Sequence, residues 1–362
     1  MKIPFIDLQA QYQEYKSEID EAIQNVLNSS QYIMGPEVMK LEDGLATYTG
    51  SKHAIACSSG TDALLIALMA MDIKPQDEVI TTPFTFISTT EVLSLLGAVP
   101  VFVDVERDTF NIDAEKIEEK INSRTKAIIP VSLYGQVADM DKINSIAAKH
   151  NLIVIEDGAQ SFGATYKGKK SGNLSDFGCT SFFPSKPLGC YGDGGALFTN
   201  DDVLAKKSRM ILAHGSKVRY QHEVVGINGR LDAIQAAILN VKLKYFAEEV
   251  KKREEIGASY LEQLKHKKVS LPVVRKNRTS VFAQFTVGST QREELITKLN
   301  ANGIPTAIYY PQPLHLQKCY ESLGYKVGDF PIAEKAAKEV FSLPMSPFLK
   351  QEDIVLICQN IS

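Results

Sequence analysis

The chain has 362 residues, of which 44% are hydrophobic and 23% charged, as in a globular protein of about two domains with a substantial core. Its formal net charge is −3, so no broad basic field is present to hold nucleic acid or an anionic membrane, and small-molecule chemistry is the default expectation. No signal-peptide pattern opens the sequence and no run of about 18 apolar residues occurs, so we expect neither secretion nor membrane spanning.

The five cysteines are scattered, with no CxxC pair and no metal-ligand spacing to the six histidines. We therefore expect reduced thiols in a cytoplasmic protein, without a metal site. His222 lies in the polar segment 215–229, and His214 directly precedes it. Both are expected to form hydrogen bonds within that loop.

The first half of the chain alternates between strands and helices. Amphipathic helices over 7–28 and 37–48 come first. Short apolar strands are then expected at 53–57, 78–81, 99–103, 127–131 and 152–155, with helices near 62–71, 88–96 and 140–150. All-apolar strands spaced by helices belong to a mostly parallel sheet covered on both faces, and ligands bind beyond the carboxyl ends of such strands.

The second half continues the pattern and then changes scale. Apolar runs at 180–183 and 196–199 are followed by a helix over 202–214 and a long helix over 231–265. The remainder is expected to form strands at 281–287 and 306–310 and helices at 291–302, 333–341 and 352–360. The predicted domains are a large one, residues 1–248, and a smaller C-terminal α/β domain, residues 249–362.

Lys186 stands on a stiff turn between the two apolar runs, bounded by Pro184, Pro187 and Gly189. A lysine among apolar residues and backbone dipoles loses hydration, which favours the neutral, nucleophilic amine. The alternative is an ordinary surface turn with a salt-bridging lysine.

Two further features lie at predicted strand ends. Gly60-Thr61 closes a strand and opens a helix, where free N–H groups and the helix dipole favour a phosphate. Asp157 ends an aliphatic strand, where a carboxylate needs a cation or donors unless it only caps a helix. A phosphate seat, an acid and a lysine together match the needs of pyridoxal phosphate, and Phe86 could stack on its ring.

Other cofactor and nucleophile motifs fail. Residues 163–170 approach a nucleotide-triphosphate loop, but Lys170 replaces the Ser or Thr that would bind magnesium. No GxGxxG follows the first strand, and Ser161 lacks the GxSxG frame of a hydrolase.

The chain contains the segments GTDAL (60–64), EDGAQSFG (156–163), SFFPSKPLG (181–189), GDGG (192–195) and NGRLD (228–232). In this order they resemble the DegT/DnrJ/StrS family of nucleotide-sugar aminotransferases, and the resemblance covers nearly the whole chain. The resemblance implies the aspartate-aminotransferase-like type I fold of pyridoxal-phosphate enzymes. It also implies a homodimer whose active sites are shared between subunits.

The resemblance also assigns roles. Lys186 would form the Schiff base and shuttle protons, Asp157 would hold the ring nitrogen, and Gln160 would lie beside the ring. Gly60, Thr61 and Ser181 would bind the phosphate, with Asn228 reaching the phosphate of the neighbouring subunit. Arg230 would be a substrate-side cation able to take a carboxylate, and Tyr309-Tyr310 occupies the substrate-binding position where the uronate enzymes have His-Tyr.

The segment 182–195 is most similar to members that aminate C-3 of UDP-2-acetamido-2-deoxy-3-oxoglucuronate with glutamate, for bacterial surface polysaccharides such as lipopolysaccharide. Tyr309 departs from that group, because a tyrosine lacks the charge that a histidine can carry. The alternatives are another 3-oxo or 4-oxo nucleotide sugar, UDP- or dTDP-linked, a sugar dehydratase, which would carry His at position 186, or a non-catalytic cofactor-binding regulator.

Overall fold

The computed structural model describes residues 3–218 and 220–361. Within them, seven strands form one sheet in the order β1 (His53–Cys57), β9 (Gly195–Thr199), β8 (Phe177–Ser181), β5 (Ile153–Asp157), β4 (Thr125–Ile128), β2 (Glu78–Thr81) and β3 (Val99–Phe102). Strand β9 is antiparallel to both neighbours, and the pairs from β8 to β3 are parallel. The predicted mostly parallel sheet is therefore confirmed, with one reversed strand.

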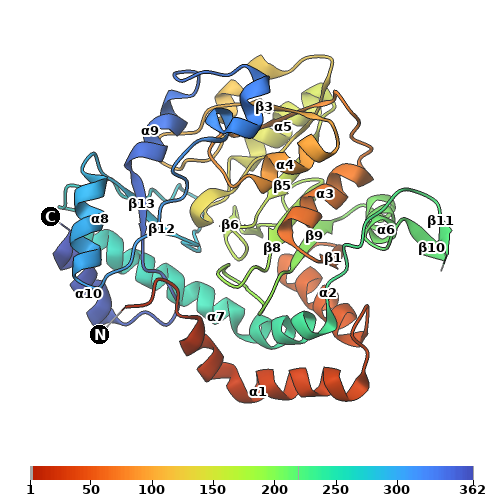
Figure 1. The fold of residues 1–362 in the computed structure, drawn as a ribbon, viewed down its shortest axis with the longest axis horizontal. Helices are drawn as coiled ribbons and strands as arrows, with labels where there is room; N and C mark the ends of the chain where they lie inside the picture. The colour runs from red at the N-terminus through yellow and green to blue at the C-terminus, as the bar shows by residue number, and fades with distance from the viewer. Residues whose placement is uncertain (1–2, 219, 362) are drawn as a thin grey trace.

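Helices cover both faces of this sheet (Figure 1). One face packs against α3 (Gly60–Ala70), α4 (Ser88–Leu95) and α6 (Asp202–Ile211), and the other against α2 (Pro36–Thr49), α5 (Met140–His150) and α7 (Ala233–Leu264). Alternate residues of β1 enter the two cores, Ile55 on the α3 side and Ala54 on the α2 side. Helix α1 (Leu8–Ser29) lies along α7, and its first turn is capped by Asp7, which accepts from Ala10 N at 2.9 Å.

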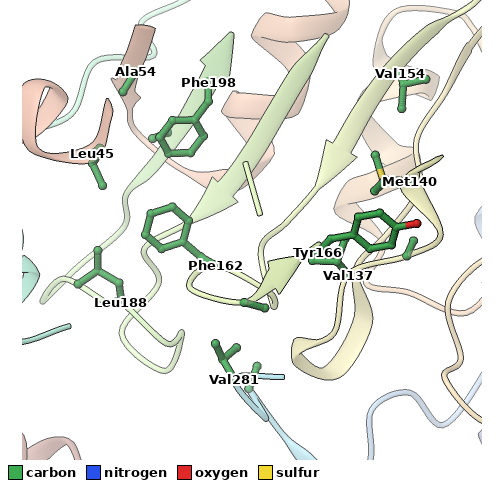
Figure 2. Close-up of a cluster of buried hydrophobic side chains, with 14 of the residues drawn as sticks. Leu45, Ala54, Val137, Met140, Val154, Phe162, Tyr166, Leu188, Phe198 and Val281 are labelled. Atoms are coloured by element: carbon green, nitrogen blue, oxygen red, sulfur yellow. The ribbon is translucent and has the colours of Figure 1, made fainter. Parts of the chain in front are cut away.

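The core on the α7 side is centred on Phe162 (Figure 2), whose ring stacks with Phe198 at 5.8 Å and with Phe246 at 5.6 Å between centroids. Leu188, two residues after Lys186, belongs to the same cluster. Val281, from the C-terminal part of the chain, also belongs to this cluster (Figure 2). The turn that presents Lys186 is therefore anchored in the largest hydrophobic core.

The C-terminal part contains an antiparallel pair, β12 (Phe285–Gly288) and β13 (Val340–Leu343), with α8 (Arg292–Ala301), α9 (Pro331–Glu339) and α10 (Gln351–Asn360). The second half of α7 packs on this pair through Tyr260, whose ring lies 4.6 Å from that of Phe285. The predicted boundary at 248/249 falls inside the continuous helix α7, and it stays a prediction.

One expectation for this part is wrong, and a second is wrong only at its last two residues. Residues 306–310 do not form a strand, because only Ala307 pairs, with Ser342, before the chain turns to bring Tyr309 and Tyr310 towards the main sheet. The predicted helix 333–341 ends at Glu339, and the next four residues form β13 instead. Pairing with β12 overrides the helical pattern there.

The connections contain short elements. The hairpin β6 (Thr165–Tyr166) and β7 (Lys169–Lys170) occupies the segment that approached a nucleotide loop, so no helix follows it. A second hairpin, β10 (Ser216–Val218) and β11 (Gln221–His222), extends from the body beside α6 (Figure 1) within the segment predicted as a loop. The 3₁₀ turns are η1 (Ala114–Lys116), η2 (Glu118–Lys120), η3 (Leu133–Gly135), η4 (Leu314–Leu316) and η5 (Lys318–Leu323). None of the helices in the described ranges is long and apolar enough to cross a membrane.

Candidate active site

A cavity of about 480 Å³ lies beyond the carboxyl ends of β1, β2, β5 and β8, where the parallel strands predicted it. Nine of the eleven predicted site residues line it: Gly60, Thr61, Phe86, Asp157, Gln160, Ser181, Lys186, Tyr309 and Tyr310. The residues at 157 and 186 thus face one cavity on the same side of the sheet.

The first corner of the cavity is the start of α3. Ser59 caps this helix by accepting from Asp62 N at 3.0 Å. Gly60 and Thr61 are the first residues of the helix, so their amides have no acceptor within it. A Cβ at position 60 would lie 2.6 Å from Cβ of Ser181, so only glycine allows the helix start and the Ser181 hydroxyl to come this close. Amides, hydroxyl and helix dipole together form a suitable anion seat.

Asp157 is buried at the end of β5. Its Oδ2 accepts from Thr89 Oγ1 at 2.8 Å and its Oδ1 from Ala159 N at 3.2 Å, so lone pairs remain for a further donor. Burial raises the pKa of this carboxyl, while the two hydrogen bonds and the charge of Lys186 oppose the rise. The neighbouring Glu156 points to the opposite face, where Gly172 N donates to it at 2.8 Å.

Lys186 is half-buried, and its pKa is lowered by burial, with the charge of Asp157 opposing that shift. Its backbone N donates to Phe183 O at 2.8 Å, and Cys190 N donates to Phe182 O at 2.8 Å, which closes the turn. A Cβ on Gly189 would lie 2.5 Å from Pro184 O, so this compact turn requires glycine there. The alternative of a salt-bridged surface lysine does not fit this position.

An aromatic and amide wall faces the turn. Phe86 lines the cavity, is 54% exposed, and its ring lies 6.2 Å from that of Tyr310. Gln160 is fixed at both ends of its amide, accepting from Tyr134 N at 2.8 Å and donating to the Tyr310 hydroxyl at 3.1 Å. Burial and the charge of Asp157 raise the pKa of Tyr310, so its hydroxyl stays protonated.

Two lining or supporting residues were missed from the sequence. Thr89, early in α4, orients Asp157, and a hydroxyl at the start of a helix that follows a strand end was the available signal. Gln284 lines the cavity, is 9% exposed, and its Oε1 has no hydrogen-bond partner among the described residues. A polar residue within the apolar run 281–287 could have revealed it.

Asn228 and Arg230 do not line this cavity. Asn228 is exposed and pairs with Ala213 in an isolated bridge, and Arg230 pairs in the same way with Cys57 at the end of β1. The Nε of Arg230 is buried, and nothing in the described part of the chain accepts from it. His222 Nδ1 lies 2.8 Å from His214 O, a hydrogen bond within the loop, as predicted.

The residues fit pyridoxal phosphate on their own chemistry. The anion seat matches its phosphate, and the incompletely satisfied buried carboxylate matches a protonated ring nitrogen. A lysine with a lowered pKa lines the same cavity as that carboxylate. Fold and site together define a pyridoxal-phosphate enzyme of the type I fold, as the sequence predicted.

The chain belongs to the DegT/DnrJ/EryC1/StrS aminotransferase family, whose model matches residues 13–362. It is 53% identical, over 99% of both chains, to UDP-2-acetamido-2-deoxy-3-oxo-D-glucuronate aminotransferase of Pseudomonas aeruginosa. It is 48% identical to the pleiotropic regulatory protein of Geobacillus stearothermophilus, over 100% of this chain and 98% of that one. The crystal structure of S. venezuelae DesV in complex with a ketimine intermediate superposes with a TM-score of 0.97 at 40% identity, covering 99% and 97% of the two chains.

Solved structures similar to this chain include NtdA of Bacillus subtilis with bound pyridoxamine phosphate and the pyridoxal- and pyridoxamine-phosphate forms of a sugar aminotransferase of Streptococcus pneumoniae. The chain is therefore a pyridoxal-phosphate-dependent aminotransferase, and the predicted class of nucleotide-sugar aminotransferase is confirmed.

Proposed function

We propose that this aminotransferase moves the amino group of glutamate to C-3 of UDP-2-acetamido-2-deoxy-3-oxoglucuronate. Glutamate would become 2-oxoglutarate, and the sugar carbonyl carbon would become a carbon that bears hydrogen and the amine. The similarity over 99% of both chains to the P. aeruginosa enzyme of that name supports this substrate. The cavity that contains both Lys186 and Asp157 supports the reaction.

Pyridoxal phosphate, when bound, supplies a carbonyl for the amine and a ring that withdraws electrons. Lys186 Nζ, whose pKa burial lowers, would take and return the proton at the reacting carbon. Asp157 would accept from the ring nitrogen and keep its proton in place. The start of α3 and Ser181 would hold the phosphate, Phe86 would cover one ring face, and Gln160 would lie beside the ring.

The carboxylate of the sugar requires a cation. In the part of the chain that the structure describes, Lys186 is the one cationic residue lining the cavity, and Tyr309 and Tyr310 supply hydroxyls. We propose that Arg230 of a second subunit supplies the missing charge and that Asn228 of that subunit contacts the phosphate. Two observations support a homodimer with shared sites. The Nε of Arg230 is buried without a hydrogen-bond partner among the described residues, and Arg230 does not line the cavity of its own subunit.

Tyr309 favours a second candidate, a 3-oxo or 4-oxo nucleotide sugar without a carboxylate, and so does the lack of any cation besides Lys186 among the described residues that line the cavity. A direct test offers the pyridoxamine-phosphate form a panel of keto sugars that differ only in the C-6 carboxylate. We expect the uronate to be preferred at least about tenfold in kcat/KM, a difference of about 1.4 kcal/mol. An equal or greater rate with the uncharged sugar would refute the uronate assignment.

The shared site has its own test. Mixing Lys186→Ala and Arg230→Ala subunits should restore activity in heterodimers, because one composite site is then intact. Sedimentation should show dimers in each separate variant. A fully active Arg230→Ala homodimer would contradict the role of that residue.

Two rivals remain distinguishable. A sugar dehydratase would need His at position 186, where this chain has Lys186. The regulatory name of the G. stearothermophilus relative raises a non-catalytic role, which predicts that glutamate leaves the absorbance of the bound cofactor unchanged. We expect glutamate to abolish the long-wavelength band and the keto sugar to restore it.

We further propose a place in bacterial surface polysaccharide synthesis, such as that of lipopolysaccharide, since amino uronic sugars are components of such polymers. A cytoplasmic location is supported by the five cysteines, all free thiols in the described ranges. We keep residues 1–248 and 249–362 as the proposed domains.

A further inference from the structure

A stripe of polar side chains on α7 lies beneath the turn that presents Lys186. Gln235, Lys242 and Glu249 are spaced by seven residues, so they lie on nearly the same face of the helix, two turns apart. Lys242 is 1% exposed and Glu249 is 2% exposed. Burying charged groups in a helix face costs free energy unless they are paired, so each needs a structural partner.

The partners of this stripe are segments that flank the active site. Gln235 Oε1 accepts from Tyr191 N at 2.9 Å. Lys242 Nζ donates to Gly189 O at 2.7 Å and lies 4.2 Å from the centroid of the Tyr191 ring. Helix α7 therefore holds the segment that follows Lys186 at two points, one on either side of Cys190.

The third member of the stripe connects α7 to α1. Both oxygens of Glu249 accept from Gln11 Nε2 at 2.9 Å. Burial lowers the pKa of Lys242 to about 8, against the opposing influence of the Glu249 charge and of the Cys190 thiol. Among the described residues, Glu249, Cys190 and Tyr191 are the titratable groups that face Lys242, and the Lys242 side chain remains largely protonated at neutral pH.

The contact at Gly189 bears directly on the lysine turn. Gly189 is packed against Pro184 O, and the turn between them carries Lys186 at its centre. Ser185 and Lys186 of this turn line the cavity, whereas Gly189 and Lys242 do not. Moving Gly189 would therefore move the backbone from which the Lys186 side chain projects.

We propose that Lys242 is a positioning residue, which fixes the turn of Lys186 through the carbonyl of Gly189 and the ring of Tyr191, with Gln235 as its second anchor. This inference rests on the proposed function, because it matters for catalysis only if Lys186 is the reacting amine. Lys242 itself does not line the cavity.

The test compares Lys242→Met with Lys244→Met. Both variants lose one lysine of α7, but Lys244 is exposed and pairs with Glu18 at 2.6 Å on the helix surface. For Lys242→Met we expect kcat to fall about tenfold with KM for both substrates within about twofold, because the reacting amine is misplaced while binding groups stay. The pH titration of the bound cofactor's absorbance should shift, and Lys244→Met should match the wild-type protein in each respect.

A second measurement needs no cofactor. Hydrogen exchange of the peptide 182–192 in the cofactor-free protein should be at least about tenfold faster in Lys242→Met, because the turn opens locally. If that variant does not fold, Gln235→Leu, which removes the other anchor, should show the same changes at smaller size. Unchanged kcat, absorbance titration and exchange in the folded variant would overturn the inference, as would a rise in KM alone.

A parallel Lys186→Ala variant separates this inference from the proposed function. If Lys186→Ala abolishes the long-wavelength band while Lys242→Met behaves as wild type, only the positioning role fails. If Lys186→Ala retains the band, the proposed reacting amine is wrong, and the positioning role falls with it.

Discussion

Replacing Asp157 with Asn should separate catalysis from stability. Asn keeps the shape, its oxygen can still accept from Ala159 N, and its amide can face Thr89, whose hydroxyl can turn to accept while donating to Thr85 at 3.2 Å. The loss is the negative charge that, in the proposed function, would face the cofactor ring. A hydrogen bond to a charged group is worth about 1.5–3 kcal/mol, so kcat should fall roughly 10- to 150-fold.

The assay follows the loss of long-wavelength absorbance with glutamate in a single turnover, beside denaturant unfolding of the cofactor-free proteins. We expect Asp157→Asn to unfold within about 1 kcal/mol of the wild-type protein, because a desolvated carboxylate is removed without leaving an unsatisfied donor. Glu156→Gln is the matched control: it lies next in the strand but faces the core, so it should change stability and leave the rate within about threefold. A wild-type rate in Asp157→Asn would refute the role of the charge.

Three further predictions follow from single contacts. Gly60→Ala would put a methyl group 2.6 Å from Cβ of Ser181. Titration with pyridoxal phosphate should therefore show an affinity at least about tenfold weaker. An unchanged affinity would contradict the proposal that the start of α3 and Ser181 bind the phosphate. Phe162→Ala removes two stacked ring contacts and should cost about 3–5 kcal/mol in urea unfolding, whereas a loss under about 1 kcal/mol would mean that the core closes around the gap. The pKa of Lys242 in the folded protein, about 8, lies below its value in the unfolded chain. Between these two pH values the unfolded chain binds more protons, so the free energy of unfolding rises with pH by up to about 1.4 kcal/mol per pH unit. Lys242→Met should lose this rise in denaturant unfolding at pH 8 and 9.5, and an unchanged rise would mean that another group causes it.

The parallel sheet could be predicted because its strands are continuous apolar runs, such as 152–155. Such a run indicates a strand without knowledge of the strands that pair with it. The C-terminal part was harder for a physical reason. Val340 continues the helical pattern of α9, and only pairing with Gly288 makes it a strand. Residues 306–310 have strand composition, but Ala307 is the one residue among them that pairs, with Ser342.

The residues of the site also divide into those that the sequence could predict and those that it could not. Lys186, Asp157 and Gly60-Thr61 could be found because chain order and strand ends placed them at one edge of the sheet. Thr89 and Gln284 depend on side-chain directions that spacing does not encode. Asn228 and Arg230 came only from family resemblance, and their position outside the cavity shows why a single chain's pattern could not supply them.

The reversed direction of β9 has a consequence for how the enzyme assembles. Because β8 and β9 are antiparallel, residues 182–194 form one excursion between neighbouring strands, and Phe182 N already donates to Gly194 O at 2.7 Å. Contacts so close along the chain form early in folding, whereas Gly60 and Tyr310 reach the same place only through long loop closures. We expect residues 182–194, which include Lys186, to form first and cofactor binding to be among the last events of refolding.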